Sequence, residues 1–260
     1  MLSDTDHNKA ADILMEAHKT KKQAVQLSTT YPGITIEDAY AISTAVAQHK
    51  IKAGAKLIGH KVGLTSKAMQ ASSQINEPDY GHLLDTMMIP DGAKVQHANY
   101  CLPRVEIELA FVLGKPLKGP GVNLLDVLRA TEYVVPAIEI VDARLQNPRK
   151  IFDTVADNGA AAGIVIGGRP IGPMETDLRW VGGIMYRNSE IEETGLAAGV
   201  LGHPALGVAW LANRLGKSGV TLEAGHLVLA GSFTRVVFAQ KGDTLHGDFG
   251  PLGGVAVQFV

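Results

Sequence analysis

Two glutamates, two residues apart, lie in one of the most apolar runs of the chain. The run from 103 to 113 reads PRVEIELAFVL and places Glu106 and Glu108 at alternate positions. Because the side chains of a β-strand alternate between its two faces, we expect both carboxylates on one face, about 6.6 Å apart along the strand. In a dry site, two such carboxylates stay charged only if a cation neutralises them. On an exposed face they would be solvated, so the pair alone is weak evidence for a metal site.

A second apolar run, VVPAIEIVDAR, contains a third carboxylate of the same kind. Its Glu139 stands between two isoleucines. Three glutamates from two strands could share one hard cation, Mg²⁺ or Mn²⁺, which keeps open positions for water and substrate. The sequence therefore predicts a metal site made of Glu106, Glu108 and Glu139. Asp142 lies outside this apolar setting, and we expect it to pair with Arg144.

Helical patterns occupy the first part of the chain, and short β-rich runs occupy the rest. Alanine and leucine recur at helical spacing near the N-terminus, and Thr35 is an expected N-cap for a helix that ends by Gly54. Two further helices are expected after Asn123 and after His203. The runs that predict strands are 57–64, 105–113, 134–141, 163–168, 181–187 with a hairpin partner across 188–189, 226–231, 234–239 and 254–260.

This order of elements predicts an α+β fold rather than regular βαβ winding. We expect a helical N-terminal segment, residues 1–56, on a β-rich catalytic domain with a mixed sheet, residues 57–260. The chain has 260 residues, is 46% hydrophobic and 19% charged, and has a formal net charge of −2. Without a dense Lys/Arg run, nucleic-acid binding is disfavoured.

The single cysteine, Cys101, excludes an internal disulfide and a zinc site built from cysteines. The N-terminus has no apolar signal-peptide core, and no run approaches the ~20 apolar residues that span a bilayer. We expect a cytoplasmic protein with no membrane partner. The glycine patterns of nucleotide-binding loops are absent at strand-to-helix junctions.

Eight sequence blocks together resemble the hydratase/decarboxylase branch of the fumarylacetoacetate hydrolase superfamily. They span about 31 to 260 and read GHKVGLTSKAMQ, EPDYG, PRVEIELAFVL, VPAIEIVDAR, FDTVADN, LGHPALGVAWLAN, LEAGHLVLAGSFT and KGDTLHGDFGPLGGVAV. The resemblance implies a mixed-sheet body of that family's type and an Mg²⁺ or Mn²⁺ ion held by Glu106, Glu108 and Glu139. It also implies a homo-oligomer, with a decamer as one expected form, and a pathway decarboxylase or aldolase as a candidate partner.

The activity that the resemblance implies is metal-dependent addition of water to a small 2-oxo or 2-hydroxydienoate in aromatic meta-cleavage catabolism. The expected substrate is the seven-carbon 2-oxo-hept-4-ene-1,7-dioate, and the expected product is 4-hydroxy-2-oxoheptanedioate. The substrate's carboxylate and C2 oxygen would chelate the ion, which acts as a Lewis acid. Hydration of the five-carbon 2-hydroxypenta-2,4-dienoate and decarboxylation of a 4-oxalocrotonate-type substrate remain alternatives.

Lys61 and Asp79 are the expected catalytic residues. Lys61 lies in the strand-like run GHKVGLTS, where it would orient or protonate the substrate near the C2 oxygen, and we expect burial beside an ion to lower its pKa. A surface lysine is the alternative. Asp79 in NEPDYG is a turn aspartate by pattern alone, but the resemblance implies an acid/base group, because hydratases of the branch carry aspartate here. Its neighbour Glu77 is the alternative for the acid/base role.

Substrate-binding residues are expected on both sides of these positions. By the resemblance, Leu64, Thr65, Ser66 and Ser232 line the pocket. A diacid also needs a cation at the far end of the pocket, and a bidentate arginine suits a carboxylate best. Arg144 is our expectation for that role. The alternatives, each of which could be a solvated surface charge, are Arg104, Arg149, Lys150 and Lys67.

Two other classes of function stay open. Hydrolysis of a carbon–carbon bond in an acylpyruvate calls for a water activated by a histidine–glutamate pair, and His60 is the candidate histidine. A non-catalytic subunit that stabilises a partner enzyme would have no need of three buried glutamates. The acidic trio therefore favours an enzyme.

Overall fold

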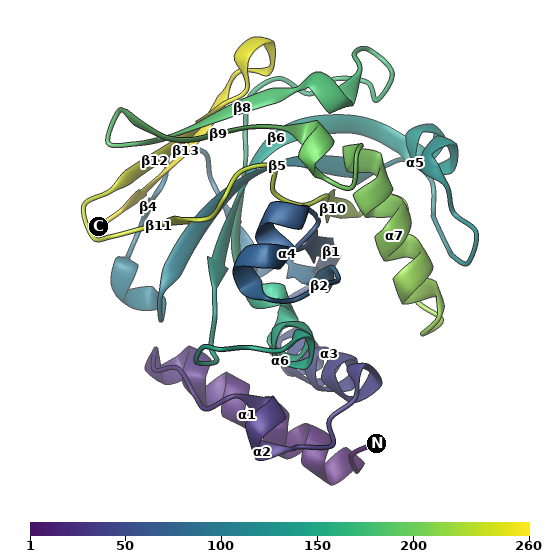
Figure 1. Cartoon of the computed structure of the whole chain (residues 1–260), viewed down its shortest axis with the longest axis vertical. Helices are drawn as coiled ribbons and strands as arrows, with labels where there is room; N and C mark the ends of the chain where they lie inside the picture. Colours follow the sequence, from purple (N-terminus) through teal and green to yellow (C-terminus); the bar gives the residue numbers. More distant parts are fainter.

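Two β-sheets and a group of helices make up the computed structural model, which describes residues 1–260 (Figure 1). The larger sheet has eight strands. In order across the sheet they are β2 (Asp79–Leu84), β1 (Leu57–Gly63), β10 (Leu227–Leu229), β5 (Pro103–Leu113), β6 (Thr131–Asp142), β7 (Ala161–Ile166) and β3 (Met88–Ile89), with β11 (Val237–Phe238) paired to β5. The smaller sheet has the order β4 (Lys94–Val95), β13 (Gly254–Phe259), β12 (Thr244–Asp248), β8 (Gly182–Arg187) and β9 (Glu190–Leu196).

The helices lie mainly at one end of the molecule. There α1 (Asp4–Thr20), α2 (Leu27–Thr30), α3 (Ile36–Lys52) and α6 (Ile151–Ala156) gather below the sheets in Figure 1. The other helices, α4 (Lys67–Ser73), α5 (Leu124–Ala130) and α7 (Pro204–Gly216), accompany the strands. Ser3 and Thr35 form capping boxes that start α1 and α3, because each hydroxyl accepts a hydrogen bond from the third backbone N–H of its helix.

The expected α+β class, with helices first and a mixed-sheet body after them, is confirmed. Thr35, Asn123 and His203 are N-caps as expected. The hairpin between β8 and β9 turns at Asn188 and Ser189, with φ of 55° and 71°, as a two-residue turn with positive φ requires. The expected helix after Asn123 ends at Ala130, because the next residues form the buried strand β6.

Strand β2 escaped the sequence analysis although it is buried throughout. Its residues, DYGHLL, combine an aspartate, a glycine and a histidine, which β-propensity disfavours or leaves neutral. Pairing with β1 overrides that weak local preference.

The helical end is bonded to the body through backbone and side-chain contacts. The backbone N–H of Ala24 donates to the carbonyl of Arg144 at 2.8 Å, and the side-chain amide of Gln23 donates to the carbonyl of Ala143 at 2.9 Å. One hydrophobic core runs through both parts, from Leu14 and Ile42 to Ile107 and Val257. The domain boundary at 56/57 stays a prediction.

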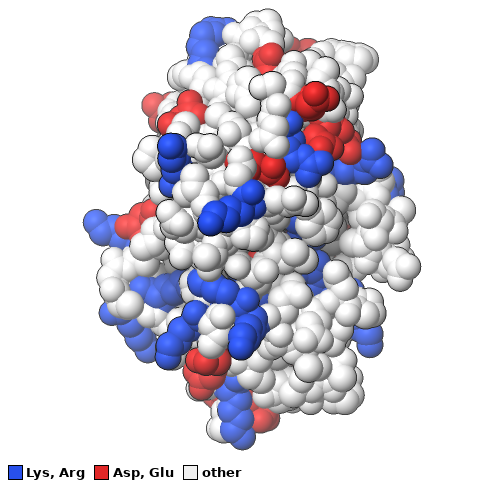
Figure 2. Space-filling view, turned by 90° about the vertical axis from the view of Figure 1, so that its left-hand side faces the viewer, with Lys and Arg blue, Asp and Glu red and all other residues white.

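Charged side chains of both signs are scattered over the face that Figure 2 shows. On that face, lysines and arginines gather mainly on the lower half, the end formed by α1 to α3 in Figure 1. No helix in the structure combines the length and the apolarity that crossing a membrane requires.

Candidate active site

The three predicted metal ligands meet on the neighbouring strands β5 and β6. In the antiparallel register Glu106 lies opposite Glu139, and Glu108 follows on the same face of β5. Their nearest carboxylate oxygens all lie within 4.8 Å of one another. Because Glu106 is only 7% exposed and the other two are fully buried, the alternative of a solvated strand face is wrong.

Burial and mutual repulsion raise the pKa values of these carboxyl groups. Desolvation is the main cause for each, and it raises the pKa of Glu139 to about 8 although Lys61 lowers it. The pKa of Glu108 is raised well above its ordinary value, first by burial and then by Glu139 and Glu106. The pKa of Glu106 is raised by burial, against the opposing effect of Lys61. Three such groups stay ionised together only beside additional positive charge.

Several oxygens of the trio accept no hydrogen bond within the protein. One oxygen of Glu108 accepts a hydrogen bond from the backbone N–H of Gly231 at 2.8 Å. Its other oxygen and both oxygens of Glu139 are buried without any hydrogen bond. Buried acceptors are nearly always satisfied, so these oxygens fit the requirements of a hard divalent cation bound by oxygen ligands.

Lys61 of β1 lies beside this trio and is 2% exposed. Its Nζ donates a hydrogen bond to the carbonyl of Gly159 at 3.0 Å and lies 3.5 Å from Glu139 and 3.6 Å from Asp79. The expectation of a surface lysine is therefore excluded. The negative charges of Glu139 and Asp79 outweigh the effect of burial and raise its pKa. The expected lowering of the pKa beside a bound ion stays a prediction.

Asp79, the first residue of β2, completes the constellation. It is 5% exposed, and its Oδ1, the atom that faces Lys61, has no hydrogen-bond partner. A turn aspartate normally bonds its own backbone, so its unbonded oxygen sets Asp79 apart from an ordinary turn residue. Glu77 is exposed and does not line the cavity described below.

A left-handed turn that the sequence analysis missed positions Lys61. Asn158, Gly159 and Ala160 have φ of 59°, 57° and 61°, a conformation that costs energy for residues other than glycine and is rarely repeated. The turn presents the Gly159 carbonyl to Lys61. Asn158 also bonds both backbone groups of His82, at 2.7 and 2.9 Å, and so fixes β2. The sequence signal was ADNGA, an Asn-Gly pair that is typical of positive φ.

A cavity of about 410 Å³ opens beside these groups. It lies within the size range of small-molecule sites. The residues that line it come from β1, β2, β5, α4, the 147–160 segment and β11, and include Lys61, Asp79, Glu106, Leu64, Arg104, Arg149 and Phe238.

Of the expected substrate-binding residues, only Leu64 lines this cavity. Thr65 is buried and its hydroxyl has no partner. Ser66 accepts a hydrogen bond from the backbone N–H of Met69 and caps α4. Ser232 donates to backbone carbonyls, including that of Ile107. The hydroxyls of Ser66 and Ser232 therefore stabilise loops around the site.

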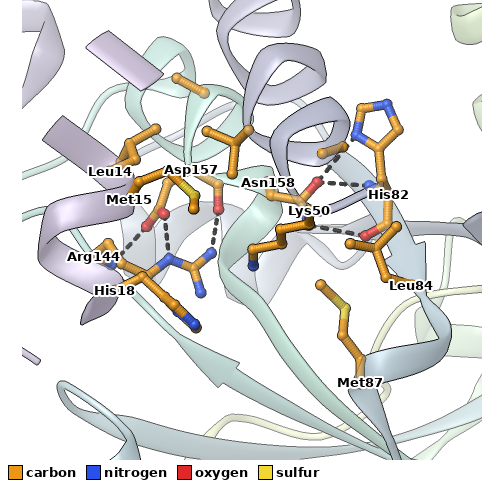
Figure 3. A pocket seen from close by; sticks show the side chains of 13 residues that line it. Leu14, Met15, His18, Lys50, His82, Leu84, Met87, Arg144, Asp157 and Asn158 are labelled. Atoms are coloured by element: carbon orange, nitrogen blue, oxygen red, sulfur yellow. Dashed lines mark hydrogen bonds and ion pairs between the residues drawn. The ribbon is translucent and has the colours of Figure 1, made fainter. Parts of the chain in front are cut away.

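Arg144 does not reach the cavity, which corrects its expected role. Its Nε lies 2.5 Å from Asp157 Oδ1 (Figure 3). Its other nitrogens donate to the backbone carbonyls of Asp157 and Ala161. The pair lines a separate pocket of about 20 Å³ that faces α1 and α3. The expected pairing of Arg144 with Asp142 is also wrong, because Asp142 accepts from the backbone N–H groups of residues 101 and 102.

His60, the candidate for a hydrolytic water, points away from the trio. It follows the alternation of β1 and packs its ring against those of His82 and His226, with centroids 5.4 and 5.8 Å away. Burial lowers its pKa to about 3. It does not line the cavity, so the geometry disfavours the histidine–glutamate hydrolase reading.

Comparisons with known proteins identify the family. Residues 39–260 match the family described as fumarylacetoacetate (FAA) hydrolase, C-terminal. The chain is 56% identical over 261 residues to a 2-oxo-hept-4-ene-1,7-dioate hydratase of Escherichia coli, covering 98% of each chain. It is 37% identical to a 4-oxalocrotonate decarboxylase of Pseudomonas putida, covering 95% of this chain and 92% of the other.

A solved structure is similar over the whole fold. The 4-oxalocrotonate decarboxylase from Pseudomonas putida G7, complexed with magnesium and adipate, superposes with a TM-score of 0.96. The two chains share 34% identity, and the match covers 100% of this chain and 99% of the other.

Proposed function

The chain belongs to the fumarylacetoacetate hydrolase family, and on that premise we propose that it is a hydro-lyase that adds water to 2-oxo-hept-4-ene-1,7-dioate. The product is 4-hydroxy-2-oxoheptanedioate. The observation that carries the proposal is the buried trio of Glu106, Glu108 and Glu139 with unbonded oxygens beside Lys61 and Asp79. The identity of 56% with a hydratase of that substrate supports the choice.

The three glutamates would hold one divalent cation, and Mg²⁺ is the ion we propose. The unbonded oxygens of Glu108 and Glu139 suit a hard cation. A bound ion supplies Lewis acidity toward the oxygens of a 2-oxo acid. A related decarboxylase of 34% identity has been solved with magnesium.

Lys61 orients the substrate. Its ammonium group, held by the Gly159 carbonyl, is directed to the space between Glu139 and Asp79. The 4-ene becomes an enone conjugated with the C2 carbonyl, through its 2-hydroxy-2,4-dienoate tautomer, when C3 loses one proton and C5 gains one. A fixed positive charge there attracts the negative charge that develops on the C2 oxygen when water then adds to C4 of this conjugated 3-enone.

Asp79 moves the proton. As the oxygen of water bonds to C4, one proton of that water passes to the Asp79 carboxylate, and C3 must gain one proton to complete the addition. A buried carboxylate with a free oxygen that lines the cavity can serve both transfers. Loss of CO₂ needs no base for water. The geometry therefore favours hydration over the decarboxylase alternative.

We also propose a homo-oligomer, with a decamer as its form, in the cytoplasm. Trp180 and Ile191, at 69% and 61% exposure, are large apolar side chains that would gain from burial between copies. Light scattering of the purified protein measures the number of copies.

Turnover with and without metal tests the proposed function. The purified protein is given the seven-carbon diacid dienol or the five-carbon monoacid dienol with Mg²⁺ or Mn²⁺, and loss of the conjugated chromophore and release of CO₂ are both recorded. We expect water addition without CO₂, faster with the diacid. EDTA should abolish turnover while circular dichroism stays unchanged, and Mg²⁺ should restore it; CO₂ release, or full activity in EDTA, would contradict the proposal.

A further inference from the structure

Two arginines in the active-site cavity have no role in the mechanism above. Arg104 of β5 and Arg149, just before α6, both line the cavity and are partly buried. The Nε of Arg104 is buried without a hydrogen-bond partner. The arginines that form ion pairs within the chain are others, namely Arg144, Arg169, Arg179, Arg187 and Arg235. Two cations therefore face one cavity without an acidic partner.

The other basic candidates for a carboxylate subsite are occupied or remote. Lys67 donates to the Gln70 side chain at 3.1 Å and does not line the cavity. Lys150 is exposed and lies outside the cavity lining. Arg144 is bonded to Asp157. Arg104 and Arg149 remain.

The positions of the two arginines suit a long acid with charge at both ends. Arg104 precedes Glu106 by two residues on β5, so its side chain leaves the same face about 6.6 Å further along the strand. Its guanidinium lies over the ring of Phe238, 5.9 Å from the centroid, which orients it. A diacid whose 2-oxo acid end lies at the trio can therefore extend along β5 toward Arg104.

The two guanidinium groups also act on one another. Burial lowers the pKa of Arg149, and the positive charge of Arg104 lowers it further. An anion between them would remove this repulsion. A carboxylate does so with favourable geometry, because its two oxygens match the planar donors of an arginine.

We propose that Arg104 and Arg149 form the subsite for the distal carboxylate and select a diacid over a monoacid of the same length. This inference rests on the proposed function, since it places the other end of the substrate at the glutamate trio. Both arginines act on binding and positioning. Neither lies among the groups that we assign to proton transfer.

Binding of two unreactive acids separates this inference from turnover. The probes are 2-oxoheptanedioate and 2-oxoheptanoate, which share length and 2-oxo acid group and differ only in the distal carboxylate. Their Kd values are measured by calorimetry in Mg²⁺ buffer. For the unaltered chain we expect about 10- to 100-fold tighter binding of the diacid, as charge-assisted hydrogen bonds provide.

In Arg149→Met the ratio of the two Kd values should fall to within about threefold of one, and Arg104→Met should lower it as well. Arg149→Lys, which keeps the charge but loses the planar donors, should give an intermediate ratio. Lys150→Met is the matched control and should keep the ratio of the unaltered chain. Circular dichroism establishes that each variant folds. If Arg149→Met does not fold, Arg149→Lys tests the subsite in its place.

The outcomes for the subsite and for the hydratase are distinguishable. If Arg149→Met keeps the full preference for the diacid, or Lys150→Met removes it, the subsite is wrong even where hydration proceeds. If the preference depends on Arg149 but the dienol is not hydrated, the proposed function is wrong and the subsite stands.

Discussion

Asp79 and Lys61 form an ion pair, and it is the only one in the structure of which both residues line the cavity beside the glutamate trio. The two residues differ in their other contacts. Lys61 is held by a backbone carbonyl as well as by carboxylates, whereas the facing oxygen of Asp79 has no hydrogen bond. A fixed cation suits orientation of a substrate, and a free carboxylate oxygen suits proton transfer. These contacts give Asp79 a role that can be tested separately from metal binding.

Asp79→Asn should lower kcat at least about 100-fold, because the amide cannot take a proton from water at neutral pH. Metal affinity, followed by titration of Mn²⁺ into the protein, should change less than about twofold, since Asp79 is not one of the trio. Glu77→Gln, two residues away and exposed, is the matched control and should retain activity. Equal losses of turnover and metal affinity in Asp79→Asn would exclude the acid/base role.

Strand periodicity predicts Glu106 and Glu108 on one face, and the second apolar run, in which Glu139 stands between two isoleucines, predicts the third member of the trio. The roles of the arginines could not be predicted from sequence. Arg144, Arg149 and Lys150 are close in sequence, yet Arg144 is bonded to Asp157 and only Arg149 lines the cavity. Which of several nearby cations is free depends on partners distant in sequence, and no local pattern records them.

At the scale of elements, the approach of β1 to β2 sets the distance between Lys61 and Asp79. Gly63 ends β1 and pairs with Asp79 in the register. A Cβ at Gly63 would lie 2.4 Å from Asp79 Oδ1 and 2.7 Å from Lys61 Nζ. Both atoms are ends of side chains, so they can move aside without unfolding the strand. Glycine at position 63 therefore leaves room for the ion pair of Lys61 and Asp79, and the backbone conformation does not require it.

Gly63→Ala should lower kcat about 10- to 100-fold, because shifts of about 1 Å in catalytic groups have effects of that size. The thermal unfolding temperature should change little. Gly33→Ala is the control, since a Cβ there meets nothing within 4 Å and its backbone has no positive φ. Unchanged kcat in Gly63→Ala would show that the pair tolerates displacement.

Some helices and strands could be predicted from sequence, and others could not. Helices with clear caps, such as the one after Thr35, and strands with continuous apolar runs could be predicted from sequence. Strand β2 and the left-handed turn at 158–160 could not, because tertiary bonds hold them. Asn158 fixes His82 of β2 through both backbone groups, a contact across 76 residues. The elements missed are the ones that position Asp79 and Lys61.

At the scale of the whole molecule, the helical end carries a partly buried positive charge where it meets the body. Lys50 of α3 lines the small pocket that also contains His18 and the Arg144–Asp157 pair (Figure 3). Burial is the main cause that lowers the pKa of Lys50 to about 8, and Arg144 and Lys21 lower it further, while Asp157 raises it. Keeping Lys50 charged therefore destabilises the packing between the helical end and the body.

Replacement of Lys50 by methionine should stabilise the protein by about 1–2 kcal/mol at pH 7, because one pKa unit corresponds to about 1.4 kcal/mol and the apolar side chain suits the pocket. Between pH 8 and 10.5 the unfolded chain binds the proton that the folded chain has lost, so the stability of the unaltered protein rises with pH. The advantage of Lys50→Met should therefore shrink as the pH is raised toward 10. Urea denaturation measures both values, with the exposed Lys52→Met as the control on the same helix. A destabilised Lys50→Met variant, or a difference independent of pH, would mean that the ammonium group has a favourable partner at this junction.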